Sequence, residues 1–225
     1  MFKSLFISDH CIESLDGVSR NLNQPAKYAN NPVLPIVPKS RSSWDADMRP
    51  SFSSVIFDDD EKLFKMWYSL WERSRPDDEA SLLAHATSKD GIKWNRPSLG
   101  LFSYRGTMDN NVVKVGSALA CGVFKDLHET DPAKRYKMLY TGIGITVYAS
   151  YSPDGLHWTP YNYGQEVIPE GRDTHAVPYW DEQLGKYVAI VRERSGKIED
   201  IRNQVISDPQ ERETNIRIWG GAPEG

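Results

Sequence analysis

The chain has 225 residues, of which 39% are hydrophobic and 26% are charged, and this composition is typical of a soluble globular protein. Its formal net charge of −4 argues against a nucleic-acid partner, because phosphates are recognised by a basic surface. The two cysteines, Cys11 and Cys121, are too few for a disulfide framework and are interpreted as free thiols.

The N-terminal segment does not have the pattern of a signal peptide. Lys3 and Asp9 interrupt its apolar run before it reaches the roughly 7–15 residues of a signal-peptide core. No other run approaches the about 20 apolar residues that span a bilayer. We therefore expect no membrane partner and, by default, a cytoplasmic protein, although an exported protein whose signal had been removed would show the same pattern.

Residues 1–50 are predicted to form an extended lead-in. Pro32, Pro35 and Pro38 lie close together among asparagines, and proline removes backbone donors while asparagine favours turns. The segment Trp44–Pro50 ends the lead-in and carries two aspartates. Its simplest interpretation is a solvated loop.

The β-rich part begins at residue 51. A short apolar run, Ser54–Phe57, and an alternating run, Leu63–Tyr68, flank an acidic turn and predict a hairpin. A third strand is expected at Leu82–Thr87 and a fourth around Trp94. Residues 71–80 are polar and are expected to form a connecting loop.

The same pattern returns further along the chain. The segment Ser88–Trp94, with the sequence SKDGIKW, recurs as Ser152–Trp158, SPDGLHW, 64 residues later. In each copy Asp-Gly predicts a tight turn, and the tryptophan is expected to bury its ring between sheets. This chemistry explains the signature as structural rather than catalytic. The acidic turn and its following strand also return, as Asp131–Tyr140 and, more loosely, as Asp181–Val191.

These repeats predict an all-β fold built from propeller blades of four antiparallel strands. The expected domains are the lead-in 1–50 and an incomplete propeller 51–225, with blades at approximately 51–98, 109–161 and 173–219. Propellers typically close with about 4–8 blades, so three blades predict an N-terminal fragment. The missing blades would be supplied in cis or by another chain.

Several phrases resemble the five-bladed propeller superfamily of glycoside hydrolases, families 32 and 43 and an uncharacterised branch of hydrolase-like proteins. They are Ala29–Leu34, Phe64–Tyr68, Thr87–Trp94, Asp109–Val113 and Gly171–Thr174. The resemblance covers nearly the whole chain. It implies three acidic residues on inner strands, namely a nucleophile or base, an Asp in an Arg-Asp-Pro stretch, and a general-acid Glu.

The resemblance assigns these roles incompletely. Asp173 matches the second acid, with Thr174 in place of proline. The usual position of the first acid falls near Ser51 or Phe52, so Asp47 or, second, Asp45 is the nearest carboxylate. No residue matches the general acid; Glu193 and Glu213 are available but match no motif. We expect Asp173 to lie beside Asp47 or Asp45.

The sequence leaves several functions open. The first is a glycoside hydrolase, or its N-terminal part, acting on or binding oligosaccharide or polysaccharide, without cofactor or metal. The second is a non-catalytic carbohydrate-binding or interaction propeller. A sialidase-like propeller is a weaker third, because Gly follows Asp too early for its box. The proposed sugar-binding residues are Trp44, Arg49, Arg172, His175 and Trp180, although Trp180 also suits a core position and His175 an ordinary strand position.

Overall fold

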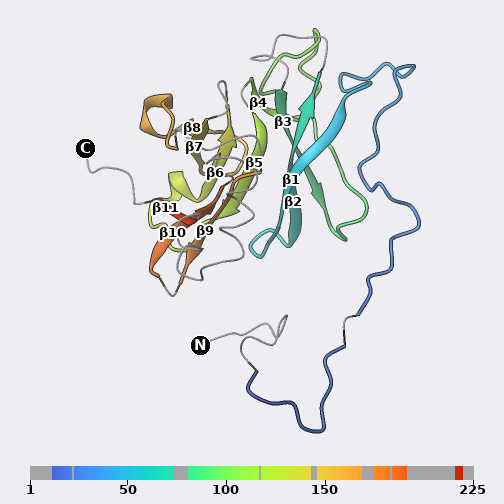
Figure 1. Cartoon of the computed structure of the whole chain (residues 1–225). Coiled ribbons are helices and arrows are strands. Elements are labelled where there is room, and N and C mark those ends of the chain that lie inside the picture. Colours follow the sequence, from blue (N-terminus) through green and yellow to red (C-terminus); the bar gives the residue numbers. More distant parts are fainter. Residues whose placement is uncertain are drawn as a thin grey trace, which may run out of the picture. The chain divides into compact units, whose positions relative to one another are not determined.

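The computed structural model describes residues 12–21, 23–72, 81–116, 118–142, 146–168, 175–182, 184–191 and 216–219. By its contacts the chain divides into two units, Met1–Asn31 and Pro32–Gly225. All strands named below belong to the second unit (Figure 1). In the part of the chain that is described, no helix is long and apolar enough to cross a membrane.

The first sheet contains four antiparallel strands in chain order. They are β1 (Arg49–Asp58), β2 (Leu63–Trp71), β3 (Ser81–Ser88) and β4 (Val112–Val115). The acidic turn between β1 and β2 is closed by Asp58, whose Oδ1 accepts the backbone N–H groups of Asp60 and Glu61 at 3.0 and 3.4 Å. The hairpin predicted from the alternating runs is confirmed.

The second sheet repeats this plan, and the described part of the third follows it. The second comprises β5 (Leu119–Lys125), β6 (Tyr136–Thr141), β7 (Val147–Ser152) and β8 (Thr159–Pro160). The third contains β9 (Val177–Asp181), β10 (Lys186–Ile190) and β11 (Ile216–Trp219), in the order β11-β10-β9.

The first strands of the three sheets lie side by side. Strand β5 contacts β1 on one side and β9 on the other (Figure 1). In a propeller, the first strands of successive blades line a common axis in this way. The prediction of an all-β protein built from four-stranded antiparallel blades is therefore confirmed.

The fourth strand of each complete sheet differs from the prediction. Around Trp94 the chain makes a single bridge, between Asn95 and Thr87, and then leaves the sheet. It returns at Val112–Val115, where the sequence placed the start of the second repeat. The second sheet does the same with a shorter excursion, pairing at Thr159–Pro160 and again through Ile168. The first blade therefore extends beyond residue 98, to Val115.

The repeated signature forms the same turn in both sheets. The hydroxyl of Ser88 accepts the N–H of Gly91 at 2.9 Å, and Asp90 Oδ1 accepts the N–H groups of Ile92 and Lys93. The second copy reproduces these bonds at Ser152–His157. Both glycines have positive φ, which other residues rarely adopt. The carboxylates of the two signature aspartates therefore accept hydrogen bonds within their own turns.

The tryptophans of the two signatures differ in one contact. Trp94 Nε1 donates to the carbonyl of Gly91 at 3.0 Å within its own turn. In the second copy the corresponding carbonyl, that of Gly155, instead accepts Trp67 Nε1 from β2 at 2.6 Å. The Nε1 atom of Trp158 is buried and has no partner among the described residues. Both signature rings are half-buried and pack against core clusters.

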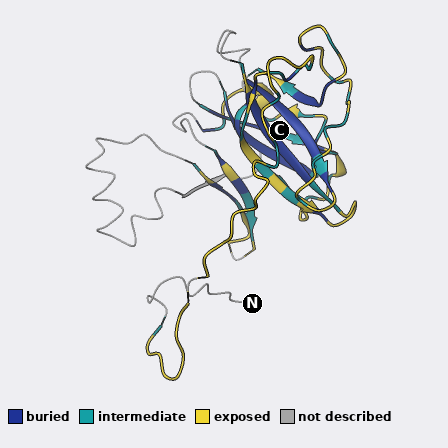
Figure 2. Cartoon of the chain, turned by 90° about the vertical axis from the view of Figure 1, so that its right-hand side faces the viewer, coloured by how far each residue is buried: buried dark blue, intermediate teal, exposed yellow. Residues whose placement is uncertain are grey.

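Apolar side chains fill the spaces between the sheets, and buried residues run along the strands (Figure 2). One cluster joins the first and second sheets and includes Trp67, Leu83, Val123 and Met138. Another contains Leu139 and Ala149 of the second sheet with Ala176 and Ala189. A third covers the other face of the first sheet with Met48, Tyr104 and the part-buried Leu34 and Trp44. Part of the predicted lead-in therefore packs on a sheet.

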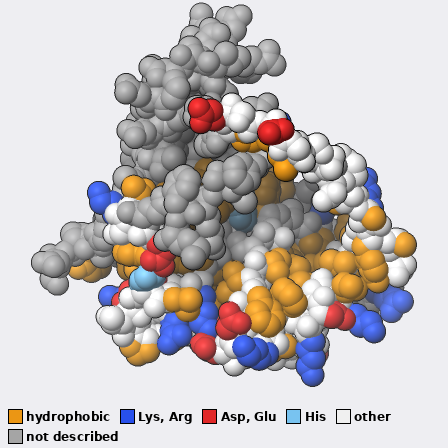
Figure 3. Space-filling view, turned by 90° about the horizontal axis from the view of Figure 1, so that it is seen from below, with side chains coloured by type: hydrophobic (Ala, Val, Ile, Leu, Met, Phe, Trp, Pro, Cys, Tyr) orange, Lys and Arg blue, Asp and Glu red, His pale blue; other side chains and the backbone are white. Residues whose placement is uncertain are grey.

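Other apolar side chains of the first sheet remain at the surface. Val55 and Phe57 on β1 are 47% and 45% exposed. Their equivalents by register in the second sheet, Val123 and Lys125, contact the first sheet. Figure 3 shows hydrophobic side chains gathered on one face of the molecule, bordered by charged side chains of both signs.

A buried ion-pair network also joins the first two sheets. Asp58, at the end of β1, is fully buried and is bound by Lys65 of β2 at 3.1 Å and Lys125 of β5 at 2.6 Å. The hydroxyl of Tyr136 on β6 donates to Asp58 Oδ2 at 2.5 Å. A carboxylate of one blade therefore satisfies a tyrosine and a lysine of the next.

The same arrangement recurs between the second and third sheets. Asp126 follows β5, is buried, and accepts Tyr187 of β10 at 2.6 Å and Lys137 of β6 at 2.7 Å. We call Asp58, Lys65 and Tyr136, and the equivalent trio Asp126, Lys137 and Tyr187, the interblade locks. Because each lock satisfies its polar groups, it can be buried without orphaned donors.

His85 provides a test of this packing by pH. Its ring is 4% exposed on β3, lies 5.2 Å from the ring of Trp67, and has no partner for either nitrogen among the described residues. Burial, reinforced by the charge of Lys65, lowers the pKa of His85 from 6.5 to about 4.

Below pH 6.5 the imidazole of His85 is therefore protonated in the unfolded chain, whereas in the folded chain it stays neutral down to about pH 4. The free energy of unfolding is expected to fall across this window, by about 3 kcal/mol for this group. Urea unfolding of wild type and His85→Leu at pH 7 and pH 4.5 measures the difference. Equal pH dependence of the two proteins would contradict the prediction.

Candidate functional site

The turn before β1 places Trp44 and Asp45 on the first sheet. Met48, 1% exposed, anchors the turn in the core, and its N–H donates to the carbonyl of Asp45 at 3.1 Å. Trp44 meets Tyr104 edge to face with ring centroids 6.2 Å apart. The indole is thus packed against Tyr104 and the core but is only half-buried.

Asp45 is fixed by an ion pair. Its side chain is largely buried, accepts Arg96 Nη1 at 2.6 Å, and also accepts the hydroxyl of Ser43. Arg96 comes from the excursion that follows the signature turn. The carboxylate therefore links that excursion to the turn before β1.

The turn that carries Trp44 and Asp45 forms one wall of the site. The chain segment between β3 and β4 forms a second wall. Arg105 donates to the carbonyls of Trp44 and Ala46 at 3.0 and 2.9 Å and pairs with Glu72 at 2.7 Å. The amide of Asn110 bonds two carbonyls of the same excursion, at 2.8 and 3.0 Å. These bonds give the polar wall a defined shape.

Two adjoining cavities lie between these walls, with volumes of about 470 and 240 Å³. Both are lined by Ser43, Trp44 and Asp109, and we call them together the Trp44 site. The larger also has Arg41 and Arg105, and the smaller Asp45, Arg96 and Asn111, in its wall. An aromatic ring, carboxylates and guanidinium groups therefore converge on one hollow.

Four of the predicted site residues lie in the turn before β1 or at its start, and two of these four line the Trp44 site. Trp44 and Asp45 line it. Asp47 is exposed, has a positive φ of 64°, and bonds Val37 through its backbone N–H. Arg49 is exposed at the start of β1. Neither Asp47 nor Arg49 lines the Trp44 site.

The remaining predicted residues belong to the third repeat. Trp180 on β9 stacks on His128 at 4.7 Å and meets Tyr187 at 4.9 Å, so its ring is occupied by packing. His175 is half-buried, and burial lowers its pKa. Arg172 and Asp173, and with them the expected approach of Asp173 to Asp47 or Asp45, lie outside the described residues.

Sequence reasoning missed three residues of the site: Asp109, Arg96 and Arg105. Asp109 is exposed, and its side chain borders both cavities. The phrase Asp109–Val113 carried part of the family resemblance, but it was assigned to the start of a repeat. The two arginines had no signal, because their partners lie 51 and 33 residues away in the chain.

The groups in the Trp44 site are better suited to binding a ligand than to donating a proton in catalysis. Asp45 is committed to Arg96 and Ser43, so it supports the wall. Asp109 faces both cavities and can accept hydroxyl groups, and Trp44 can contact the apolar face of a ring.

No family model matches the chain, and no curated protein does. Among solved structures, it is similar to an N-acetylgalactosamine deacetylase from F. plautii in complex with blood group B trisaccharide, at 14% identity and a TM-score of 0.49, covering 74% of this chain and 49% of that one. A GH43 β-1,3-galactosidase with galactodeoxynojirimycin gives 16% identity and a TM-score of 0.46, covering 71% of this chain and 55% of that one.

A GH32 β-fructofuranosidase from Bombyx mori gives 17% identity and a TM-score of 0.44, covering 76% of this chain and 34% of that one. The chain thus spans about half or less of the length of these proteins. Because all three TM-scores are below 0.5, the fold assignment rests on the sheets themselves. The structural matches include families 43 and 32, the two families that the sequence phrases resemble.

Proposed function

We propose that this chain is a glycoside hydrolase-like propeller protein that binds carbohydrate at the Trp44 site. The observation that carries the proposal is the convergence of Trp44, Asp109 and Arg105 on adjoining cavities. A sugar ring has one apolar face and a rim of hydroxyl groups. An indole beside carboxylate and guanidinium groups is complementary to both.

Binding is favoured over hydrolysis for this chain by itself. Hydrolysis of a glycosidic bond uses two carboxyl groups, one of which protonates the leaving oxygen and contributes about 10²–10⁴-fold. Asp45 and Asp109 border the same smaller cavity, but Asp45 is held in its ion pair with Arg96. We therefore expect binding of oligosaccharides without turnover.

Calorimetric titration with a panel of neutral oligosaccharides tests the proposal. Replacing Trp44 with alanine is expected to weaken binding about tenfold or more, since burial of an aromatic face contributes on the order of 1.4 kcal/mol or more. Asp109→Asn keeps the shape of an exposed side chain and is expected to weaken binding less. Tyr163→Ala removes a fully exposed aromatic elsewhere and is the matched control.

Unchanged affinity in both Trp44→Ala and Asp109→Asn, with melting temperatures equal to wild type, would place sugar binding elsewhere. Release of sugar from aryl glycosides or oligosaccharides by the purified chain would contradict the expectation of binding without turnover.

A further inference from the structure

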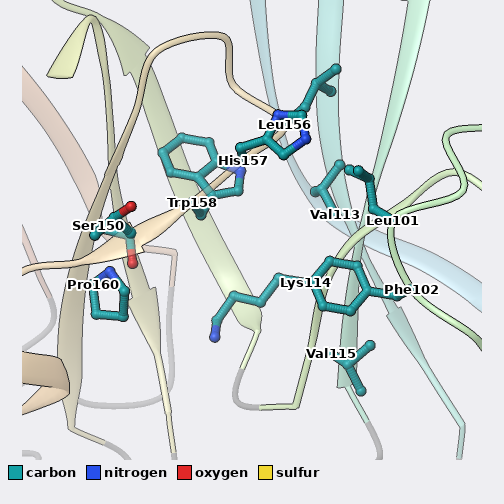
Figure 4. A pocket seen from close by; sticks show the side chains of 11 residues that line it. Leu101, Phe102, Val113, Lys114, Val115, Ser150, Leu156, His157, Trp158 and Pro160 are labelled. Carbon is teal, nitrogen blue, oxygen red and sulfur yellow. The ribbon is translucent and has the colours of Figure 1, made fainter. Parts of the chain in front are cut away.

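A separate cavity of about 340 Å³ lies between the outer strands of the first two sheets (Figure 4). One wall comes from β4 and the excursion before it, and the other from β7, the second signature turn and β8. None of its lining residues belongs to the Trp44 site. We call it the Lys114 cavity.

Among the described residues, the ammonium group in this cavity has no counter-ion. Lys114 is half-buried on β4, and its Nζ lies 4.7 Å from the ring centroid of Tyr140. No carboxylate of the described residues forms an ion pair with it. Burial lowers the pKa of Lys114, and every other largely buried lysine described here pairs with a carboxylate.

Trp158 lines the same cavity, with its indole nitrogen covered by the protein. Trp158 Nε1 has no partner among the described residues, and the carbonyl of Gly155 accepts Trp67 Nε1 of the neighbouring sheet. In the first repeat the equivalent bond, from Trp94 to Gly91, is made. The Trp158 ring borders the cavity although its nitrogen is covered, so its indole resonance can report on a ligand bound there.

The rest of the wall limits what can bind. Phe102, Val115, Leu156 and Pro160 make it largely apolar, and the hydroxyl of Ser150 is bonded to Tyr140. His157 also borders the cavity but is bound by Asp154 at 2.7 Å. Figure 4 shows Lys114 and Trp158 projecting from opposite walls. The volume is near the lower end of the about 300–1,000 Å³ found for small-molecule pockets.

We propose that the Lys114 cavity binds a small carboxylate ligand with a single ring, its anion held by the Lys114 ammonium. A carboxylate has several acceptor sites and provides the missing counter-charge. The ring would lie against the apolar wall. This site is independent of carbohydrate binding at the Trp44 site.

Titration with glucuronate, benzoate and glucose, followed by the indole N–H resonances of the protein, tests the proposal. Glucuronate or benzoate is expected to shift the Trp158 resonance saturably, and glucose is not. Comparing the two acids distinguishes a sugar acid from an aromatic acid. Because Lys114 binds through its charge, raising the salt concentration is expected to weaken binding.

Lys114→Met is the decisive variant. It keeps the length of the side chain and removes a charge without a counter-ion, so the fold is expected to be retained. Carboxylate affinity is expected to fall about tenfold or more, as for loss of a charged hydrogen bond. Lys93→Met on an exposed turn is the matched control.

Two results would overturn the proposal. One is the failure of both acids to shift the Trp158 resonance in wild type. The other is equal carboxylate affinity in wild type and Lys114→Met. Trp44→Phe distinguishes the two sites, because it is expected to leave carboxylate binding at the Lys114 cavity unchanged while weakening neutral sugar binding.

Discussion

Replacing Asp58 with alanine is expected to lower the free energy of unfolding by about 3–5 kcal/mol, the cost of breaking a buried ion pair by removing one partner. Asp58 is fully buried, and its loss would leave the ammonium groups of Lys65 and Lys125 without their carboxylate. It would also remove the acceptor of the Tyr136 hydroxyl. Urea unfolding of both proteins at pH 7 measures the change.

The neighbouring Asp60 is the matched control. Its side chain is 71% exposed, although it also pairs with Lys125, so Asp60→Ala is expected to leave the unfolding free energy nearly unchanged. Tyr136→Phe removes only the hydroxyl and is expected to cost about 1–3 kcal/mol. A loss below about 1 kcal/mol for Asp58→Ala would contradict the role of the interblade lock.

The lock also predicts a pH dependence. Burial would by itself raise the pKa of Asp58, but hydrogen bonds from Lys125, Tyr136 and Lys65 outweigh it and hold the pKa well below its usual value. The stabilisation is therefore present above the unfolded pKa of 3.8 and is lost as the pH falls below it. This window lies below that of His85, so acid titration separates the two groups.

Gly122→Ala is expected to destabilise the protein by about 3 kcal/mol or more, the upper range for overpacking a core. A Cβ at Gly122 on β5 would lie 1.8 Å from the carbonyl oxygen of Ala176 and 2.6 Å from Pro178 Cδ. The clashing oxygen belongs to the backbone of Ala176, the residue just before β9, and a backbone atom cannot rotate away as a side chain can. The third sheet would have to move from the second.

Gly142→Ala provides the comparison within the same sheet. A Cβ there would meet only the ring of Tyr148, the nearest atom at 2.3 Å, and that ring can move. Its cost is expected to be smaller, about 1 kcal/mol. Thermal melting compares the two variants, and equal losses would show that β9 does not pack on β5 as described.

Local signals in the sequence predicted much of the fold. The signature turns at Ser88–Trp94 and Ser152–Trp158 depend on bonds between residues at most three positions apart, so their chemistry is visible in the sequence. The alternating run Leu63–Tyr68 likewise specifies a strand. These elements therefore follow from local pattern.

Contacts between distant residues were not predictable in this way. Strand β4 pairs with β3 only after an excursion whose length no local rule determines. The bond between Tyr136 and Asp58 joins residues 78 positions apart, and Trp67 takes the Gly155 carbonyl across 88. Each depends on how two sheets meet, which the pattern of a single strand does not contain.

The residues of the candidate site also fall into those that local sequence could predict and those that depend on contacts between distant segments. Trp44 and Asp45 could be proposed because they immediately precede the first strand of the repeat. Asp109 belongs to the site because the excursion from the first sheet folds back beside Trp44. Asp47 was favoured over Asp45 by its nearness to β1, but its positive φ and exposed side chain leave it outside the cavities.

The most direct test of carbohydrate binding at the Trp44 site uses the indole N–H resonances of the seven tryptophans during titration with neutral oligosaccharides. The Trp44 resonance, identified by its absence in Trp44→Phe, is expected to shift saturably, while those of buried Trp67 and half-buried Trp94 remain in place. A titration in which no indole shifts, or in which only Trp158 or Trp180 responds, would contradict this function.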